Sequence, residues 1–137
     1  MKALAETYKL IPLIVPKSIT ATETGTGVNV EAYDDDALGM VLFGAVGGTT
    51  ETHDVVFQGS NDTTNGSDGT WTTLTTVGQV TGSNGDNKSA AGRVNLSGYK
   101  WVRAKDTMSS TTASLIAVSI LVKPFQEGSS VNSLTPA

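Results

Sequence analysis

Short stretches in which apolar and polar residues alternate run through most of this chain. In the segment 93–106, Tyr99, Trp101 and Arg103 occupy one parity and Val102 occupies the other. Side chains of an extended strand point alternately to its two faces, so this pattern predicts a strand with two chemically different sides. Related patterns predict further strands at 27–33, 53–58, 70–77 and 113–123.

Two apolar stretches depart from simple alternation. The segment 37–46, ALGMVLFGAV, is apolar at both parities, so we expect a strand that is covered on both sides. The segment 10–15, LIPLIV, contains one proline and is followed by Pro16. Proline is confined to edge strands and irregular segments of sheets, which predicts an extended edge strand or a peptide that lies on another surface.

The spacing of strands and turns predicts the fold class. Asn-Gly and Asp-Gly pairs within 65–69 are strong turn signals, because these residues tolerate positive φ. Several short strands separated by such turns predict an all-β protein, either an antiparallel β-sandwich or a jelly-roll-like barrel. We expect an extended N-terminal arm over residues 1–20, a sandwich domain over 21–124 and a C-terminal tail over 125–137.

Composition restricts the classes of partner. The length of 137 residues suits one domain, and the net charge of −4 opposes a broad attraction to nucleic acid or anionic lipid. No apolar run approaches the ~20 residues of a membrane-spanning helix. Cysteine is absent, which excludes disulfides, thiolate metal sites and thiol nucleophiles. We therefore expect neither nucleic acid nor a membrane as partner.

Candidate catalytic and metal-binding residues are few. His53 is the only histidine, and we expect it at a strand edge or on the surface rather than in a catalytic triad. Asp34, Asp35 and Asp36 could offer oxygen ligands to a hard cation, but consecutive side chains diverge and a solvated turn is the simpler interpretation. We expect no catalytic, metal or cofactor site, and hence no enzyme.

The aromatic residues allow two interpretations. Trp71, Tyr99 and Trp101 could form a stacking platform for sugars or bases, with Arg103 adding charge. Alternatively, the two tryptophans pack across the sandwich. We favour the second interpretation, with Trp101 in the interior and Arg103 near the margin of that face, paired with a carboxylate.

Four stretches of the sequence together resemble a known family. The order TGTGVNV, DVVFQGSNDTTNGSDGTWTTL, GYKWVRAKDT and ASLIAVSILV is similar to that of small β-sandwich virion proteins of tailed bacteriophages, over roughly residues 25–123. The resemblance implies a structural protein of the particle, made in the host cytoplasm, that decorates the exterior of the head. It implies the major capsid protein and further copies of the chain as partners, with a trimer preferred, and it does not imply an enzyme.

The apolar N-terminal peptide is the candidate interface under this interpretation. We expect its side chains to hold the sandwich to neighbouring copies and to the capsid, and deletion of residues 1–16 to leave a folded sandwich that no longer loads onto heads. The alternative function is a carbohydrate-binding or host-adhesion module that uses Trp71, Tyr99 and Trp101. The five candidate interface residues are Leu10, Ile11, Leu13, Ile14 and Val15.

Overall fold

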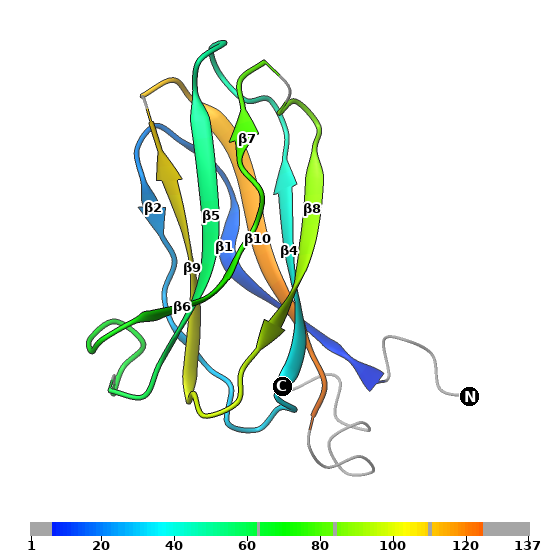
Figure 1. The fold of residues 1–137 in the computed structure, drawn as a ribbon, viewed down its shortest axis with the longest axis vertical. Helices are drawn as coiled ribbons and strands as arrows, with labels where there is room; N and C mark the ends of the chain where they lie inside the picture. The colour runs from blue at the N-terminus through cyan, green and yellow to red at the C-terminus, as the bar shows by residue number, and fades with distance from the viewer. Residues whose placement is uncertain (1–6, 63, 84, 110, 125–137) are drawn as a thin grey trace.

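The computed structural model describes residues 7–62, 64–83, 85–109 and 111–124. All its regular elements in these ranges are strands (Figure 1). In chain order they are β1 (Lys9–Ile19), β2 (Glu23–Thr24), β3 (Val28–Asn29), β4 (Asp36–Phe43), β5 (Thr52–Ser60), β6 (Thr72–Thr76), β7 (Val80–Thr81), β8 (Ser89–Asn95), β9 (Trp101–Met108) and β10 (Ser114–Val122).

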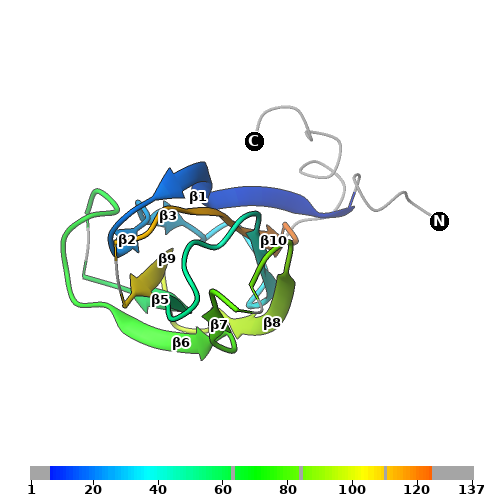
Figure 2. The ribbon, with the colours of Figure 1, turned by 90° about the horizontal axis from the view of Figure 1, so that it is seen from above.

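The strands form two antiparallel sheets that pack face to face (Figure 2). One sheet has four strands in the order β1-β10-β4-β8. The other has six strands, with the order β2-β9-β5-β6, to which β3 adds beside β9 and β7 beside β5. The predicted all-β antiparallel sandwich is therefore confirmed, and the described strands do not close into a barrel.

The core lies between the sheets and follows the predicted alternation. Val102 and Ala104 of β9 in one sheet, and Val118 and Ile120 of β10 in the other, are all fully buried. Phe57 of β5 is also fully buried, and its ring lies where a side chain on Gly39 of β4 would otherwise stand. The missing side chain on one sheet thus admits an aromatic ring from the other, which is how interdigitated interiors reach their density.

The first long strand corrects the predicted domain boundary. β1 pairs with β10 from Lys9 opposite Val122 to Ile19 opposite Ser114, so residues 9–19 form an edge strand of the sandwich rather than a separate arm. The pairing is interrupted by register shifts on either side of Ile14. Residues 1–6 and the predicted tail, 125–137, lie outside the described residues.

Three of the predicted strands differ in the structure. The strand predicted at 93–106 is divided, because residues 93–95 end β8 in the four-stranded sheet, the chain turns at 97–98, and β9 begins at Trp101 in the six-stranded sheet. The strand predicted at 27–33 is reduced to β3, because the chain turns after Asn29 and the backbone N–H of Tyr33 donates to the carbonyl of Val30 at 3.1 Å. The strand predicted at 37–46 exists as β4, but only one of its sides is buried by the chain itself. Among the described residues, no helix is long and apolar enough to cross a membrane.

Candidate functional site

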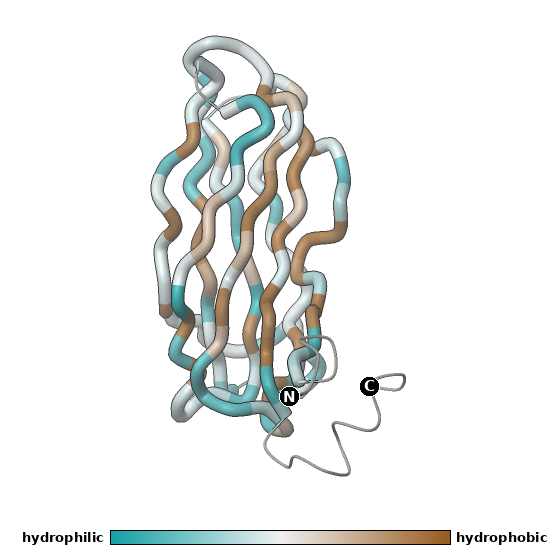
Figure 3. Tube along the Cα trace, turned by 90° about the vertical axis from the view of Figure 1, so that its right-hand side faces the viewer, coloured by the Kyte–Doolittle hydropathy of each residue, from teal (hydrophilic) through white to brown (hydrophobic). Residues whose placement is uncertain are grey.

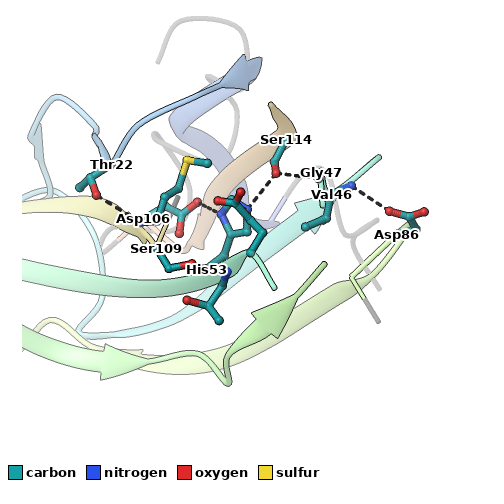
Figure 4. A network of polar contacts seen from close by, with 11 residues as sticks. Thr22, Val46, Gly47, His53, Asp86, Asp106, Ser109 and Ser114 are labelled. Atoms are coloured by element: carbon teal, nitrogen blue, oxygen red, sulfur yellow. Dashed lines mark hydrogen bonds and ion pairs between the residues drawn. The ribbon is translucent and has the colours of Figure 1, made fainter. Parts of the chain in front are cut away.

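A buried polar cluster joins the two sheets at one end of the sandwich. His53 lies on the inner side of β5, Asp106 on the inner side of the neighbouring β9, and Ser114 is the first residue of β10 in the opposite sheet. Figure 4 shows the imidazole of His53 between the other two side chains. Glu51, just before β5, completes the cluster, with Oε1 3.9 Å from Nε2 of His53. Three strands from two layers thus meet through polar side chains.

The distances within the cluster are those of strong hydrogen bonds. Nδ1 of His53 lies 2.6 Å from Oδ2 of Asp106, and Nε2 lies 2.9 Å from Oγ of Ser114. With a proton on Nδ1, the ring donates to the carboxylate and accepts the hydroxyl proton of the serine. The hydroxyl oxygen in turn accepts the backbone N–H of Gly47 at 3.1 Å. Both ring nitrogens are then satisfied, as buried polar atoms require.

The prediction that His53 lies at a strand edge or on the surface is wrong. His53 and Asp106 are fully buried, and Ser114 and Glu51 are 1% exposed. The order of carboxylate, imidazole and hydroxyl is that of a catalytic triad, but a nucleophile must touch its substrate. In this conformation the serine hydroxyl is closed off from solvent, so the arrangement acts as a contact between the sheets.

Burial also changes the acidity of the cluster. Removal from water raises the pKa of the Asp106 carboxyl above its ordinary value, and the negative charges of Asp54 and Glu51 raise it further, while the hydrogen bond and charge of His53 oppose the rise. Oδ1 of Asp106 has no hydrogen-bond partner among the described residues. The folded protein therefore holds a proton on Asp106 more tightly than the unfolded chain does.

This raised pKa predicts a pH dependence of stability. As the pH rises above about 4, Asp106 loses its proton in the unfolded chain before it does so in the folded protein. The free energy of unfolding that this proton contributes therefore falls as the pH rises, until the pH exceeds the pKa of Asp106 in the folded protein. Asp106→Asn keeps an oxygen that can accept from His53 but cannot ionise. We expect the stability of this variant, relative to the unmutated protein, to increase with pH above about 4 in urea unfolding experiments.

The control for this experiment is Asp36→Asn. Asp36 is exposed and forms an ion pair with Arg93 at 2.6 Å, and exposed pairs contribute about 0–1 kcal/mol. This substitution should change the free energy of unfolding by no more than about 1 kcal/mol. If the stability of Asp106→Asn relative to the unmutated protein did not change with pH, the buried carboxyl would not be the group responsible.

The predicted aromatic set is divided by the structure. Trp101 and Arg103 point to the outer side of β9, because Val102 and Ala104 take the inner side. The prediction that Trp101 lies in the interior is therefore wrong, as is the packing of the two tryptophans across the sandwich. Tyr99 precedes β9, and its ring lies against Gly59 of β5, where any larger residue would place its side chain.

Trp101 packs against the loop between β5 and β6, which contains Gly66 and Trp71, on the outer side of the six-stranded sheet. The guanidinium of Arg103 lies 4.2 Å from the centre of the Trp71 ring, and its Nε donates to Oε1 of Gln58 at 2.9 Å, so its partner is an amide rather than the expected carboxylate. A side chain on Gly27 would overlap Trp71, and one on Gly66 would press on Trp101. Intramolecular contacts thus occupy part of both rings; ligand stacking stays a prediction.

The outer side of the four-stranded sheet carries the largest exposed apolar side chains. Leu38 and Leu42 of β4, Leu115 of β10 and Leu10 of β1 are 38%, 54%, 48% and 55% exposed. Register places Leu121 between Leu10 and Leu38. Sheets that face water normally alternate apolar inside with polar outside. The prediction that 37–46 is covered on both sides is therefore wrong for the single chain. We call this surface the leucine face, and it consists of Leu10, Leu38, Met40, Leu42, Leu115, Ala117, Ser119 and Leu121.

The predicted interface peptide contributes only partly to exposed surface. Ile11, Leu13 and Ile14 are 8%, 4% and 3% exposed and belong to the core, because β1 pairs with β10 and turns them inward. Leu10 lies on the leucine face, and Val15 is 58% exposed at the irregular part of β1. Figure 3 shows hydrophobic segments running along neighbouring strands of the molecule.

Charged residues lie at the margins of the leucine face. Asp36 begins β4 and pairs with Arg93 of β8, and Lys17 of β1 pairs with Glu23 at 2.5 Å. Of the expected acidic turn, Asp35 and Asp36 are exposed and Asp34 is half-buried. Within the described part of the chain, no group of three or more histidine or acidic side chains is arranged to hold a metal ion.

The fold and these surfaces define a two-layer antiparallel β-sandwich with one uncovered apolar side. No protein-family model matches the sequence, and no curated protein matches it. Among solved structures, the fold is similar to the crystal structure of the SPBc2 prophage-derived protein YomS, with a TM-score of 0.51 and 12% sequence identity. The match covers 85% of this chain and 93% of that one. At this identity the likeness establishes the fold.

Proposed function

We propose that the protein is a structural component of a phage particle, namely a decoration protein that binds the exterior of the head and the major capsid protein. The fold it shares with a prophage-derived protein supports a phage origin. The proposal assigns no catalytic step, because the buried hydroxyl, imidazole and carboxylate connect the sheets and are closed to solvent.

The leucine face is the observation that carries this proposal. Contiguous apolar surface on a folded chain marks a site of protein contact, and depletion of charge at the centre of a patch is typical of interface cores. The outward positions of β10, from Leu115 to Leu121, contain no charged residue, and the charges lie at the margins. A surface of this kind suits a protein that works by binding other proteins.

The strength of such a contact favours several attachments at once. Full burial of a leucine contributes about 1.5–3 kcal/mol, so four leucines that are already half covered contribute on the order of 3–6 kcal/mol. Association costs an estimated ~4–15 kcal/mol. One contact is therefore marginal, whereas an oligomer that binds a repeating lattice gains from the effective concentration of its linked sites.

Binding to bare heads tests the proposed function. We expect the purified protein to sediment with undecorated heads of the parent phage and to reach a fixed ratio to the capsid protein. Leu42→Lys places a charge on the leucine face and should weaken loading by at least about tenfold. The matched control is Thr76→Lys, which adds the same charge at an exposed position of β6 in the other sheet. Heads that remain bare at saturating protein would contradict the proposal.

A second candidate function rests on a hollow among the loops at the end of the sandwich where β4 and β9 begin. Tyr33, Tyr99, Glu31, Asp35 and Lys100 are among the residues that line a surface hollow of about 410 Å³. Aromatic rings beside carboxylates and an amine are a chemistry that suits a sugar. A glycan-binding screen separates the two functions: sugar binding that Glu31→Gln abolishes in a folded protein would favour host adhesion over decoration.

A further inference from the structure

We infer that the leucine face is the contact between two copies of this chain, which pair sheet to sheet about a two-fold axis. The inference rests on the proposed function and names a second copy as the occupant of the leucine face. The linked pair then binds the head through another surface of each copy, and Leu42→Lys weakens loading because it separates the two linked binding sites. Aligned packing of two sheets, about 10 Å apart, is the ordinary way in which β surfaces cover each other.

The apolar pattern of 37–46 is the first reason to expect that another apolar protein surface covers the leucine face. Its inner residues Val41 and Phe43 are buried by the chain, while Leu38 and Leu42 on the other side are not. A strand that is apolar on both sides is typical of a sheet buried on both faces. The single chain supplies one covering layer, and a second copy supplies the other.

The balanced charges around the leucine face favour a partner surface that also has no excess of positive or negative charge. Arg93 pairs with Asp36, and Lys17 pairs with Glu23, so these marginal charges are balanced within one copy. Asp34 and Lys123, which lie beside Leu38 and Leu121, add one charge of each sign. These marginal residues together carry no excess of either sign, although each chain has a net charge of −4. A partner chosen by charge would require an unbalanced margin.

The relief of the face also fits a two-fold pairing. One hollow lies beside Leu38 and Leu121 at one end and is also lined by two carboxylates and two cations. Another hollow, lined mostly by apolar residues, lies beside Leu42 and Leu115 at the other end. Across the middle, register places Met40 beside Ser119 of β10. A two-fold axis that lies between the two faces, parallel to the strands, would set the apolar hollow of each copy against the same hollow of its partner and would keep the charged hollows together at the other end.

The edges of the sheets are less suitable for self-association. Pro12 and Pro16 remove two N–H donors from β1, the edge strand of the four-stranded sheet, and prolines on an edge oppose the addition of a further strand. At the other edge, Oγ of Thr75 of β6 donates to the carbonyl of Arg93 in β8 at 2.7 Å, which partly covers that strand.

A single patch that meets itself requires a two-fold contact, because a ring of three uses two different patches on each subunit. The inference therefore replaces the trimer expected from the family resemblance with a two-fold pair. Larger assemblies would need a second contact that the leucine face does not provide.

Sedimentation equilibrium of the purified protein, without heads, tests the pairing. We expect a monomer–dimer equilibrium in the unmutated protein. Leu42→Lys and Leu115→Lys should each raise its dissociation constant by at least about tenfold, while Thr76→Lys leaves it unchanged. Circular dichroism and thermal unfolding of each variant establish that loss of the dimer is not loss of the fold.

Cross-linking tests the orientation of the two copies. The chain has no cysteine, so Ser119→Cys introduces one thiol near the middle of the leucine face, close to the inferred axis. A short bismaleimide should join this variant into covalent dimers in high yield. Thr76→Cys, on the outer side of the other sheet, should give only the background yield.

The outcomes separate this inference from the proposed function. A protein that stays monomeric at all concentrations, or a dimer that both leucine-face variants leave intact, would overturn the pairing. If such a monomer loads onto heads and Leu42→Lys prevents it, the face binds the capsid, and decoration stands without the pairing. If the face-paired dimer forms but does not load, the pairing stands without decoration.

Discussion

Replacing Leu13 or Ile14 with alanine is expected to lower the free energy of unfolding by about 2–5 kcal/mol for each substitution. Both side chains lie in the core, 4% and 3% exposed, on the strand that pairs with β10. Truncation removes their contacts and leaves a cavity between the sheets. Urea unfolding followed by tryptophan fluorescence measures the change.

The control is Val15→Ala on the same strand. Val15 is 58% exposed and lies outside the leucine face, and surface substitutions usually stay within about ±0.5 kcal/mol.

Deletion of residues 1–16 tests the assignment of β1 to the sandwich. We expect the truncated chain not to fold, because the deletion removes most of β1, whereas a separate arm could be removed without loss of the fold. A truncated chain that unfolds cooperatively with unchanged stability would contradict the assignment of β1 to the sandwich.

Replacing His53 with alanine is expected to lower the free energy of unfolding by about 3–5 kcal/mol. The substitution removes the imidazole from between Asp106 and Ser114 and leaves a fully buried carboxyl without the hydrogen bond to its Oδ2. It also removes the ring that packs against Phe43, with the two centroids 5.1 Å apart. Chemical denaturation at neutral pH measures the loss.

Ser114→Ala provides the graded comparison. It removes the hydroxyl that bonds to His53 and Gly47 but leaves the imidazole and carboxylate together, so a smaller cost of about 1–3 kcal/mol is expected. A hydrolase would respond differently, since a triad variant would lose turnover while keeping its stability. Unchanged stability in His53→Ala, together with loss of a measurable activity, would contradict the structural role of the cluster.

Alternation in the sequence was sufficient to predict the inner sides of the central strands. Val55 and Phe57 in β5, and Ile116 and Val118 in β10, face the core as their parity indicates. Alternation over 93–106 did not show that the chain changes sheets within this segment. Val94 of β8 and Val102 of β9 are both buried, but they reach the core from opposite sheets.

The buried cluster was missed although part of its signal was present. His53 shares the parity of Val55 and Phe57, and Asp106 shares that of Val102 and Ala104, so both could have been placed inside. Pattern alone gives neither the pairing of β5 with β9 nor the position of Ser114 across the sandwich. These depend on contacts between residues separated by 53 and 61 positions.

The sequence predicted the leucine face only in part. The apolar residues of 37–46 at both parities indicated two covered sides, but not that the chain itself covers only one. The prolines of LIPLIV predicted either an extended edge strand or a peptide that lies on another surface. The structure has the edge strand, and the inward residues of that strand complete the core.

Electron cryo-microscopy of heads incubated with the purified protein tests the central claim most directly. The claim is that this sandwich decorates a phage head through protein contacts. It predicts additional density on the head exterior at repeating lattice positions, into which the two sheets fit with the leucine face covered. Heads that stay smooth under saturating protein, or bound sandwiches whose leucine face remains open to solvent, would contradict it.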